Sequence, residues 1–199
     1  MRKAVLFKLA LLMIAVSFAP LLWISPTHAS LVNYLTPNQS YPGLQLWLDA
    51  STLPTSSTNI SLWEDLSPTG SDVSQGTGSS QPSYVASNAT FNTWPTVHFD
   101  GGDVLNTTAL TNALSLDGAN PRTIFVAFKQ DAAENKSILG FGSSANLQAS
   151  EVIVYTSKIT GHFYGSGNDT LSTTTQTMTP GQRIVATMRY DGTTVDMFQ

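Results

Sequence analysis

The sequence predicts an all-β fold, an antiparallel sandwich or jelly roll built from two sheets. Short runs of β-branched and aromatic residues recur along the chain, and clusters of Gly, Pro, Asn and Asp separate them. No stretch has the length and periodicity of a long helix, and only residues 107–116 have any helical character. Because the chain has no cysteine, such a domain must be held together by core burial rather than by disulfides.

Residues 1–29 indicate a secretory signal peptide. A basic start precedes an apolar stretch over residues 9–24, and small residues at both recognition positions precede a cleavage point after Ala29. The mature chain would then begin at Ser30 and reach the outside of the cell or its surface. The alternative is an uncleaved anchor, because residues 5–24 are nearly long enough to span a bilayer, although a lysine and a proline interrupt them. No second run of that length follows, so we expect no membrane span after cleavage.

The charge of the mature chain limits its partners. After removal of residues 1–29 it carries six basic and thirteen acidic side chains, a net charge of −7 with histidine neutral. Nucleic acids and anionic membranes are poor partners for such a surface. The same chain is rich in Ser, Thr, Asn and Gly, which suits many polar, uncharged contacts.

The elements follow from local patterns. Residues 30–42 form a polar lead-in, and one domain is predicted over residues 43–199. Its first strand is predicted where leucines alternate with other residues at 44–49, and residues 67–83 are predicted to be a long loop. An Asp-Gly pair at 191–192 predicts a hairpin turn. The predicted strands are 44–49, 95–99, 122–129, 137–141, 151–156, 158–164, 183–190 and 193–198.

Several motifs together resemble one family. The motifs are Leu46-Trp-Leu-Asp-Ala50, Trp63-Glu-Asp-Leu-Ser67, Pro95-Thr-Val-His-Phe-Asp-Gly101, Thr123-Ile-Phe-Val-Ala-Phe128 and Arg189-Tyr-Asp-Gly192. In this order they resemble the concanavalin A-like, laminin G-like domains of exported proteins. The resemblance covers about residues 43–198 and implies a two-sheet jelly roll.

The resemblance also implies a function, because such domains most often serve as carbohydrate-binding or adhesive modules. We therefore expect a non-catalytic recognition or adhesion module whose partner is a glycan or a surface protein. A structural surface or matrix domain without a small ligand is the alternative, and a glycoside hydrolase with a divergent site is another. The laminarinase-like motif Glu-x-Asp-x-x-Glu is absent, since none of Glu64, Glu134 and Glu151 has an aspartate two residues later. The chain is therefore predicted not to be an enzyme.

Two pairs of residues are candidate binding groups. A flat aromatic ring can stack on the apolar face of a sugar, and Trp94 and Tyr84 are the candidates for this role, with packing as the alternative. Calcium is the commonest cofactor of the resembling family, and Asp100 and Asp103 could supply oxygen ligands. The alternative is that these two carboxylates bond backbone amides in a glycine turn.

The predicted last strand, 193–198, runs into Gln199 without a turn or a polar tail. In resembling domains further strands follow and complete the jelly roll. We therefore expect a domain truncated at its C-terminus, with an exposed sheet edge that favours aggregation or marginal stability.

Overall fold

The computed structural model describes residues 43–55, 58–107, 120–142, 149–155, 157–164, 170–174 and 176–199. The predicted signal peptide and the lead-in lie outside these residues, as does most of the segment with helical character. Within the described ranges, no helix is both long enough and apolar enough to cross a membrane.

The described residues form strands and short 3₁₀ turns, which confirms the all-β prediction. The strands are β1 (Leu62–Trp63), β2 (Val73–Ser74), β3 (Ser83–Val85), β4 (Thr96–His98), β5 (Arg122–Lys129), β6 (Lys136–Gly142), β7 (Ala149–Tyr155), β8 (Lys158–Tyr164), β9 (Thr170–Thr173), β10 (Arg183–Tyr190) and β11 (Val195–Phe198). The 3₁₀ turns are η1 (Ala50–Thr52), η2 (Gly78–Ser80) and η3 (Ala89–Phe91).

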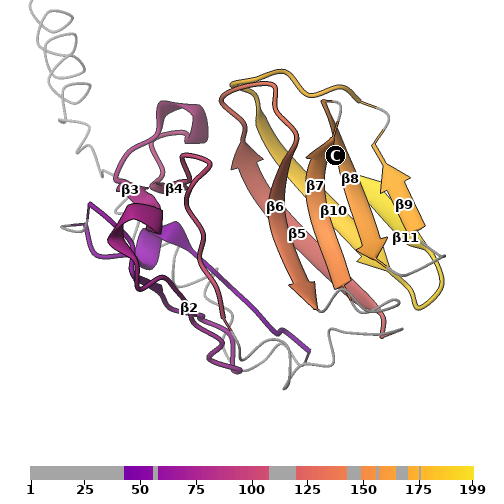
Figure 1. The fold of residues 1–199 in the computed structure, drawn as a ribbon, viewed down its shortest axis with the longest axis horizontal. Coiled ribbons are helices and arrows are strands. Elements are labelled where there is room, and N and C mark those ends of the chain that lie inside the picture. Colours follow the sequence, from indigo (N-terminus) through magenta and orange to yellow (C-terminus); the bar gives the residue numbers. More distant parts are fainter. Residues whose placement is uncertain are drawn as a thin grey trace, which may run out of the picture. The chain divides into compact units, whose positions relative to one another are not determined.

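The strands pair into four small antiparallel sheets. One of the two larger sheets has the order β11-β10-β5, and the other has the order β6-β7-β8-β9 (Figure 1). The two smaller sheets are the pairs β1–β2 and β3–β4. Every strand pair of these sheets is antiparallel, and the register places each paired residue directly opposite one residue of the neighbouring strand.

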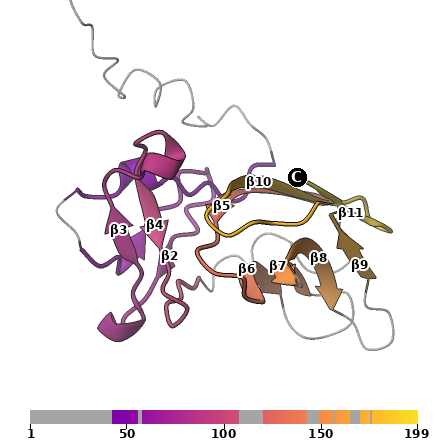
Figure 2. The ribbon, with the colours of Figure 1, turned by 90° about the horizontal axis from the view of Figure 1, so that it is seen from above.

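A single hydrophobic cluster joins the two larger sheets, which form two layers in Figure 2. Alternate residues of β10 are buried, as expected for a strand with one face toward a core. The buried members of the cluster are Val152, Val154, Ile159, Met178, Ile184, Ala186, Met188, Tyr190 and Val195. Because each large apolar side chain contributes about 1.5–3 kcal/mol when fully buried, this cluster is the main source of stability for residues 120–199.

A glycine allows the two layers to approach closely. A Cβ atom at Gly161 on β8 would lie 2.7 Å from Met197 Sδ, 2.9 Å from Met188 Sδ and 3.0 Å from Val195 Cγ1. These distances are shorter than normal van der Waals contacts, so the side chains of β10 and β11 occupy the space of the missing methyl group. A side chain at this position would therefore require Met188 and Met197 to shift.

Arg122 links the same two sheets through its guanidinium group. The guanidinium carbon lies 5.5 Å from the ring centre of Phe141 on β6 and 5.2 Å from that of Tyr190 on β10. Nη1 donates a hydrogen bond of 3.2 Å to the carbonyl of Asn120, and the residue is only 9% exposed. Two aromatic faces and a carbonyl therefore compensate the burial of this charge.

Residues 43–107 bury Leu53, Ile60 and Val73 and, beside them, the carboxylate of Asp65. Its Oδ1 accepts hydrogen bonds from the amides of Trp47 at 2.8 Å and Ser67 at 2.9 Å. Its Oδ2 accepts from Ser67 Oγ at 2.6 Å, Thr69 Oγ1 at 3.0 Å and the amide of Ser71 at 2.8 Å. Burial acts to raise the pKa of Asp65, but these hydrogen bonds outweigh it, so that the pKa lies below its ordinary value.

The strand predicted at 44–49 is wrong, and Asp65 explains why. The amide of Trp47 donates to the Asp65 carboxylate, and the carbonyl of Trp47 accepts from the amide of Leu66 at 3.0 Å. The carbonyl of Gln45 accepts from Thr69 Oγ1 at 2.7 Å. The backbone groups of Gln45 and Trp47 are thus hydrogen-bonded to residues 65–69. Although leucines alternate along residues 44–49, this segment is not a strand.

The longer strands agree better with the sequence. β5, β8 and β10 have the predicted bounds, and β4, β6, β7 and β11 differ from their predicted ranges by one or two residues at an end. The predicted loop at 67–83 is partly wrong, because it contains β2 and η2. The sequence analysis also missed β3 and β9, which have only three and four residues.

Candidate functional site

The predicted ligand-binding residues Tyr84 and Trp94 lie in or beside the β3–β4 pair. Tyr84 is in β3 opposite Val97 of β4, and Trp94 lies just before β4. The carbonyl of Trp94 accepts from the amide of Asn88 at 3.1 Å, which closes the turn between the strands. Both aromatic residues are half-buried, so part of each is accessible. Ligand binding by these residues stays a prediction.

The predicted calcium ligands Asp100 and Asp103 lie together in the turn after β4. Asp103 Oδ2 accepts from the amide of Asp100 at 2.8 Å, and Asp100 Oδ1 accepts from the amide of Gly102 at 2.8 Å. Gly101 has a φ of 95°, which favours glycine at this position of the turn. Among the described residues, no three or more His, Cys, Asp or Glu side chains are grouped so that they could hold a metal ion. The two carboxylates bond backbone amides in a glycine turn, which is the alternative that the sequence offered for them.

A larger surface feature lies on the sheet β11-β10-β5. One face of this sheet contributes to the core, and we call the opposite, solvent-facing side the outer face. Because side chains alternate along a strand, every second residue of each strand belongs to it. Its members are Thr123, Phe125, Ala127, Lys129, Arg183, Val185, Thr187, Arg189, Asp196 and Phe198.

Three of these residues form a row across the three strands, which we call the aromatic row. Thr187 in β10 is directly opposite Phe125 in β5 and also directly opposite Phe198 in β11. Phe125 is 73% exposed and Phe198 is 54% exposed. Beside this row, Val185 is 60% exposed. The outer face therefore presents an apolar patch to solvent.

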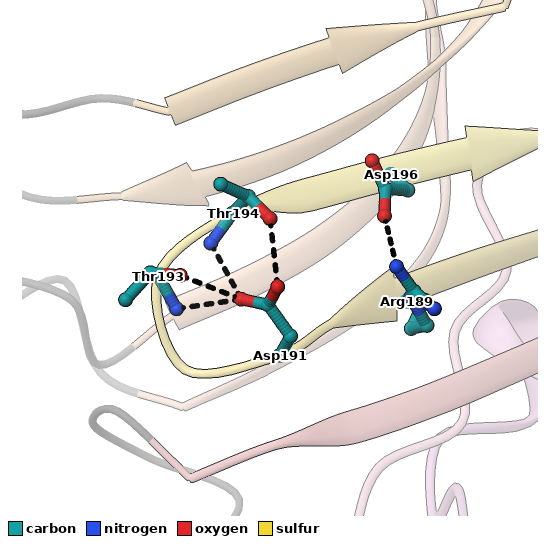
Figure 3. A network of polar contacts seen from close by, with 5 residues as sticks. All are labelled: Arg189, Asp191, Thr193, Thr194 and Asp196. Carbon is teal, nitrogen blue, oxygen red and sulfur yellow. Dashed lines mark hydrogen bonds and ion pairs between the residues drawn. The ribbon is translucent and has the colours of Figure 1, made fainter.

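A second row, which we call the polar row, runs beside the first. Arg189 in β10 is opposite Thr123 in β5 and Asp196 in β11. Arg189 Nη2 and Asp196 Oδ2 form an ion pair of 2.7 Å, which Figure 3 shows across the hairpin. Both side chains remain partly exposed, so their outer edges can still donate and accept hydrogen bonds.

The hairpin turn fixes the register that aligns both rows. In Figure 3 the Asp191 carboxylate faces Thr193 and Thr194, and it accepts from the amide and hydroxyl of each at 2.8–3.0 Å. The amides of Thr194 and Thr193, followed by their hydroxyl groups, hold the pKa of Asp191 well below its ordinary value. Gly192 has a φ of 105°, and the predicted hairpin is confirmed, but its turn spans residues 191–194 because Tyr190 pairs with Val195.

The sequence did not predict this site because β5 carries apolar residues on both faces. Ile124, Val126 and Phe128 point toward the core, whereas Phe125 and Ala127 point outward, so no polar alternation distinguishes the two sets. A signal was present, since an apolar run in an antiparallel sheet leaves apolar residues on the solvent side unless that side is covered. The ranges of β5 and β10 were predicted, but the face that each residue occupies was not.

His162 also has a neighbour that its sequence position did not reveal. It is directly opposite Glu151 in the β7–β8 ladder, and His162 Nδ1 lies 3.9 Å from Glu151 Oε2. Both side chains are about 15% exposed. Neither a family model, nor a curated protein, nor a solved structure matches this chain.

Proposed function

We propose that this chain is an exported, non-catalytic recognition module that binds glycans on the outer face of β11-β10-β5. The proposal takes the fold to be a two-sheet jelly roll of the concanavalin A-like, laminin G-like kind, which the sequence motifs resemble. The two layers that share one core support such a fold. The observation that carries the function is the aromatic row, in which Phe125 and Phe198 are mainly exposed.

The exposure of these two phenylalanine rings indicates an interaction site. Burying a phenylalanine side chain contributes about 1.5–3 kcal/mol, and this sheet already buries its other face in a core. Single apolar residues on a surface are common, but a contiguous patch typically marks an interaction site. Phe125, Val185 and Phe198 are exposed on one face of three adjacent strands, with Thr187 between the two phenylalanines.

A glycan suits this patch because sugars are apolar on their faces and polar at their edges. Aromatic rings stack on the C–H groups of a pyranose, while hydroxyl groups need donors and acceptors nearby. The polar row supplies both, with Arg189 as donor and Asp196 as acceptor. A protein partner or a second copy of the chain would need apolar complementarity but not this neighbouring pair.

The test is a glycan array probed with the secreted chain and with three variants. Phe125→Ala should lose binding and keep its melting temperature, because the side chain is 73% exposed. Tyr84→Ala and Trp94→Ala test the site predicted from the sequence, and they should bind like the unmodified chain if the outer face is the binding site. Loss of binding in these two variants alone would place the ligand at the β3–β4 pair instead. Failure of the unmodified chain to bind any glycan would favour the structural-domain alternative.

Two further measurements test the other parts of the proposal. Mass spectrometry of the secreted protein should find Ser30 at its N-terminus, and residues 1–29 on that protein would contradict signal cleavage. Incubation with polysaccharides should release no reducing sugar. Release that survives purification to homogeneity would show a hydrolase with a divergent site.

A further inference from the structure

The edge of β5 is a second interaction surface, and we propose that two copies of this chain associate by pairing their β5 strands across a two-fold axis. The sheet order β11-β10-β5 leaves one side of β5 without a partner strand among the described residues. This inference does not rest on the proposed function, because it concerns the backbone at the edge of the sheet and not the side chains of its outer face.

Of the edge strands of the two larger sheets, β5 is the one without protection against pairing. It has eight residues, pairs with β10 without a register shift, and carries charged side chains only at its ends, Arg122 and Lys129. In contrast, β9 and β11 have four residues each, and β6 contains a bulge between Ser137 and Leu139. Short strands and bulges keep sheet edges from pairing, and β5 has neither.

Two backbone hydrogen bonds show which polar groups of β5 point away from β10. The amide of Asp191 donates to the carbonyl of Thr194 at 3.3 Å, so the amide of the preceding residue, Tyr190, points away from β11 and toward β5. The carbonyl of Gln130 accepts from the amide of Gly181 at 2.7 Å. Because these groups alternate along a strand, the even-numbered residues of β5 bond β10. The odd-numbered residues, which we call the edge residues, direct their groups to the open side, and they are Thr123, Phe125, Ala127 and Lys129.

The core is incomplete beside this edge. Three alternate residues of β10 are at most 3% exposed, and they are Ile184, Ala186 and Met188. The residues opposite them in β5 also pack against the core cluster but are only half-buried, and they are Phe128, Val126 and Ile124. Burial therefore decreases from one strand to the next, and a further strand with apolar side chains at every second position would cover these three residues.

A second copy of β5 satisfies the backbone in one antiparallel register. When Val126 lies opposite its counterpart in the other copy, Thr123 lies opposite Lys129 and Phe125 lies opposite Ala127. Each N–H and C=O of the edge residues then has a partner, because this set maps onto itself. A register shifted by two residues toward the N-terminus would place Lys129 opposite Pro121, which has no N–H to donate.

The same register suits the side chains. Ile124 lies opposite Phe128 of the other copy on the core side, where both are only half-buried, so the two cores continue into one another. No cation lies opposite another, because Lys129 faces a threonine and Arg122 faces Gln130. The dimer is then one continuous sheet made of two three-stranded sheets, with both outer faces on the same side.

The experiment is sedimentation equilibrium of the secreted chain over a wide range of concentrations. The mass should be that of two chains at high concentration and of one chain at low concentration. Ala127→Pro removes an N–H that points to the edge and does not bond β10, so this variant should become monomeric with an unchanged circular dichroism spectrum. Ala127→Ser keeps the N–H and is the matched control, which should still dimerise.

Charge substitutions test the register. Thr123→Glu would lie opposite Lys129 of the other copy and should tighten the dimer a few-fold, whereas Thr123→Lys should weaken it by a similar factor. Adding Lys129→Glu to Thr123→Lys should restore the dimer, which a change within one copy would not do. Weakening by both Thr123 variants would refute this register.

Hydrogen exchange locates the contact. The amides of the edge residues should exchange more slowly at dimeric than at monomeric concentrations, and those of Ile124, Val126 and Phe128 should be slow at both. A chain that stays monomeric with fast exchange at the edge residues would refute the proposal. Slow exchange in a monomer would show that the edge is covered within one chain. A dimer that survives Ala127→Pro would place the interface elsewhere.

Discussion

In residues 43–107 no described strand is longer than three residues, whereas five strands in residues 120–199 have seven or eight. The buried side chains differ in kind as well. Asp65, Ser67 and Ser71 are buried in the first region beside Leu53, Ile60 and Val73, and an apolar cluster that spans two sheets is buried in the second. A polar network therefore accompanies a small apolar set in one part of the chain, whereas a larger apolar cluster dominates the other.

This difference predicts how each region responds to mutation and to pH. A polar network depends on the protonation state and geometry of a few atoms, since a buried donor that loses its acceptor is costly. A packed apolar core depends on volume, since a missing methyl group leaves a cavity.

The largest expected effect is in the apolar core. Ile159→Ala should lower the free energy of unfolding by about 2–5 kcal/mol, because the side chain is completely buried between the two sheets. Ile159→Val is the matched control and should cost only about 0.5–1.5 kcal/mol. Urea unfolding measures both. Equal losses in the two variants would show that the core collapses around the site.

The next effect is in the polar network. Asp65→Asn should cost about 1–3 kcal/mol, because the amide group that replaces one carboxylate oxygen cannot accept the bonds now made to it. Hydrogen exchange should show faster exchange at the amides of Trp47, Ser67 and Ser71. Glu64→Gln, an exposed neighbouring change, is the control. Equal exchange in both variants would contradict the role of Asp65.

The lowered pKa of Asp65 makes its contribution to the free energy of unfolding depend on pH. Its folded-state pKa is lower than the ordinary value near 3.9, so its stabilisation is fully present above that pH and is lost as pH falls through the folded-state pKa. Stability measured by urea unfolding should therefore decrease on acidification, and this decrease should be smaller in Asp65→Asn. An identical pH profile in the variant would mean that other carboxylates dominate.

A smaller effect is expected at the β10–β11 turn. Asp191→Ala removes four hydrogen bonds, but the turn is exposed and water can replace them. The amides of Thr193 and Thr194 should lose protection, and oligosaccharide affinity should fall because Phe198 is held less firmly. Thr193→Ser, which keeps the hydroxyl, is the control. Unchanged protection of both amides would show that the Gly192 backbone alone fixes the turn.

The smallest effect is expected on removal of calcium. Asp100 and Asp103 accept hydrogen bonds within their own turn, so a chelator should not change the melting temperature. A bound ion at a hundred times its Kd would add about 2.7 kcal/mol to stability. A melting temperature that falls by several degrees in chelator, and recovers with calcium but not with magnesium, would establish the site.

The sequence by itself located the long strands and the hairpin turn. The ranges 122–129, 158–164 and 183–190 were predictable because β propensity and alternation are properties of neighbouring residues. The β10–β11 hairpin was predictable for the same reason, although its turn spans residues 191–194 and not the Asp-Gly pair alone. The strands of two to four residues carry too little local pattern to be distinguished from loops.

Only the tertiary structure decided which face of each strand meets solvent and which distant groups become partners. The leucine alternation at 44–49 predicted a strand, but a carboxylate at residue 65 bonds the backbone of Trp47 instead. Phe125 and Phe198 are far apart in the chain and lie in one row because both strands pair with β10. Burial and pairing depend on contacts between residues separated by tens of positions, and no local pattern contains that information.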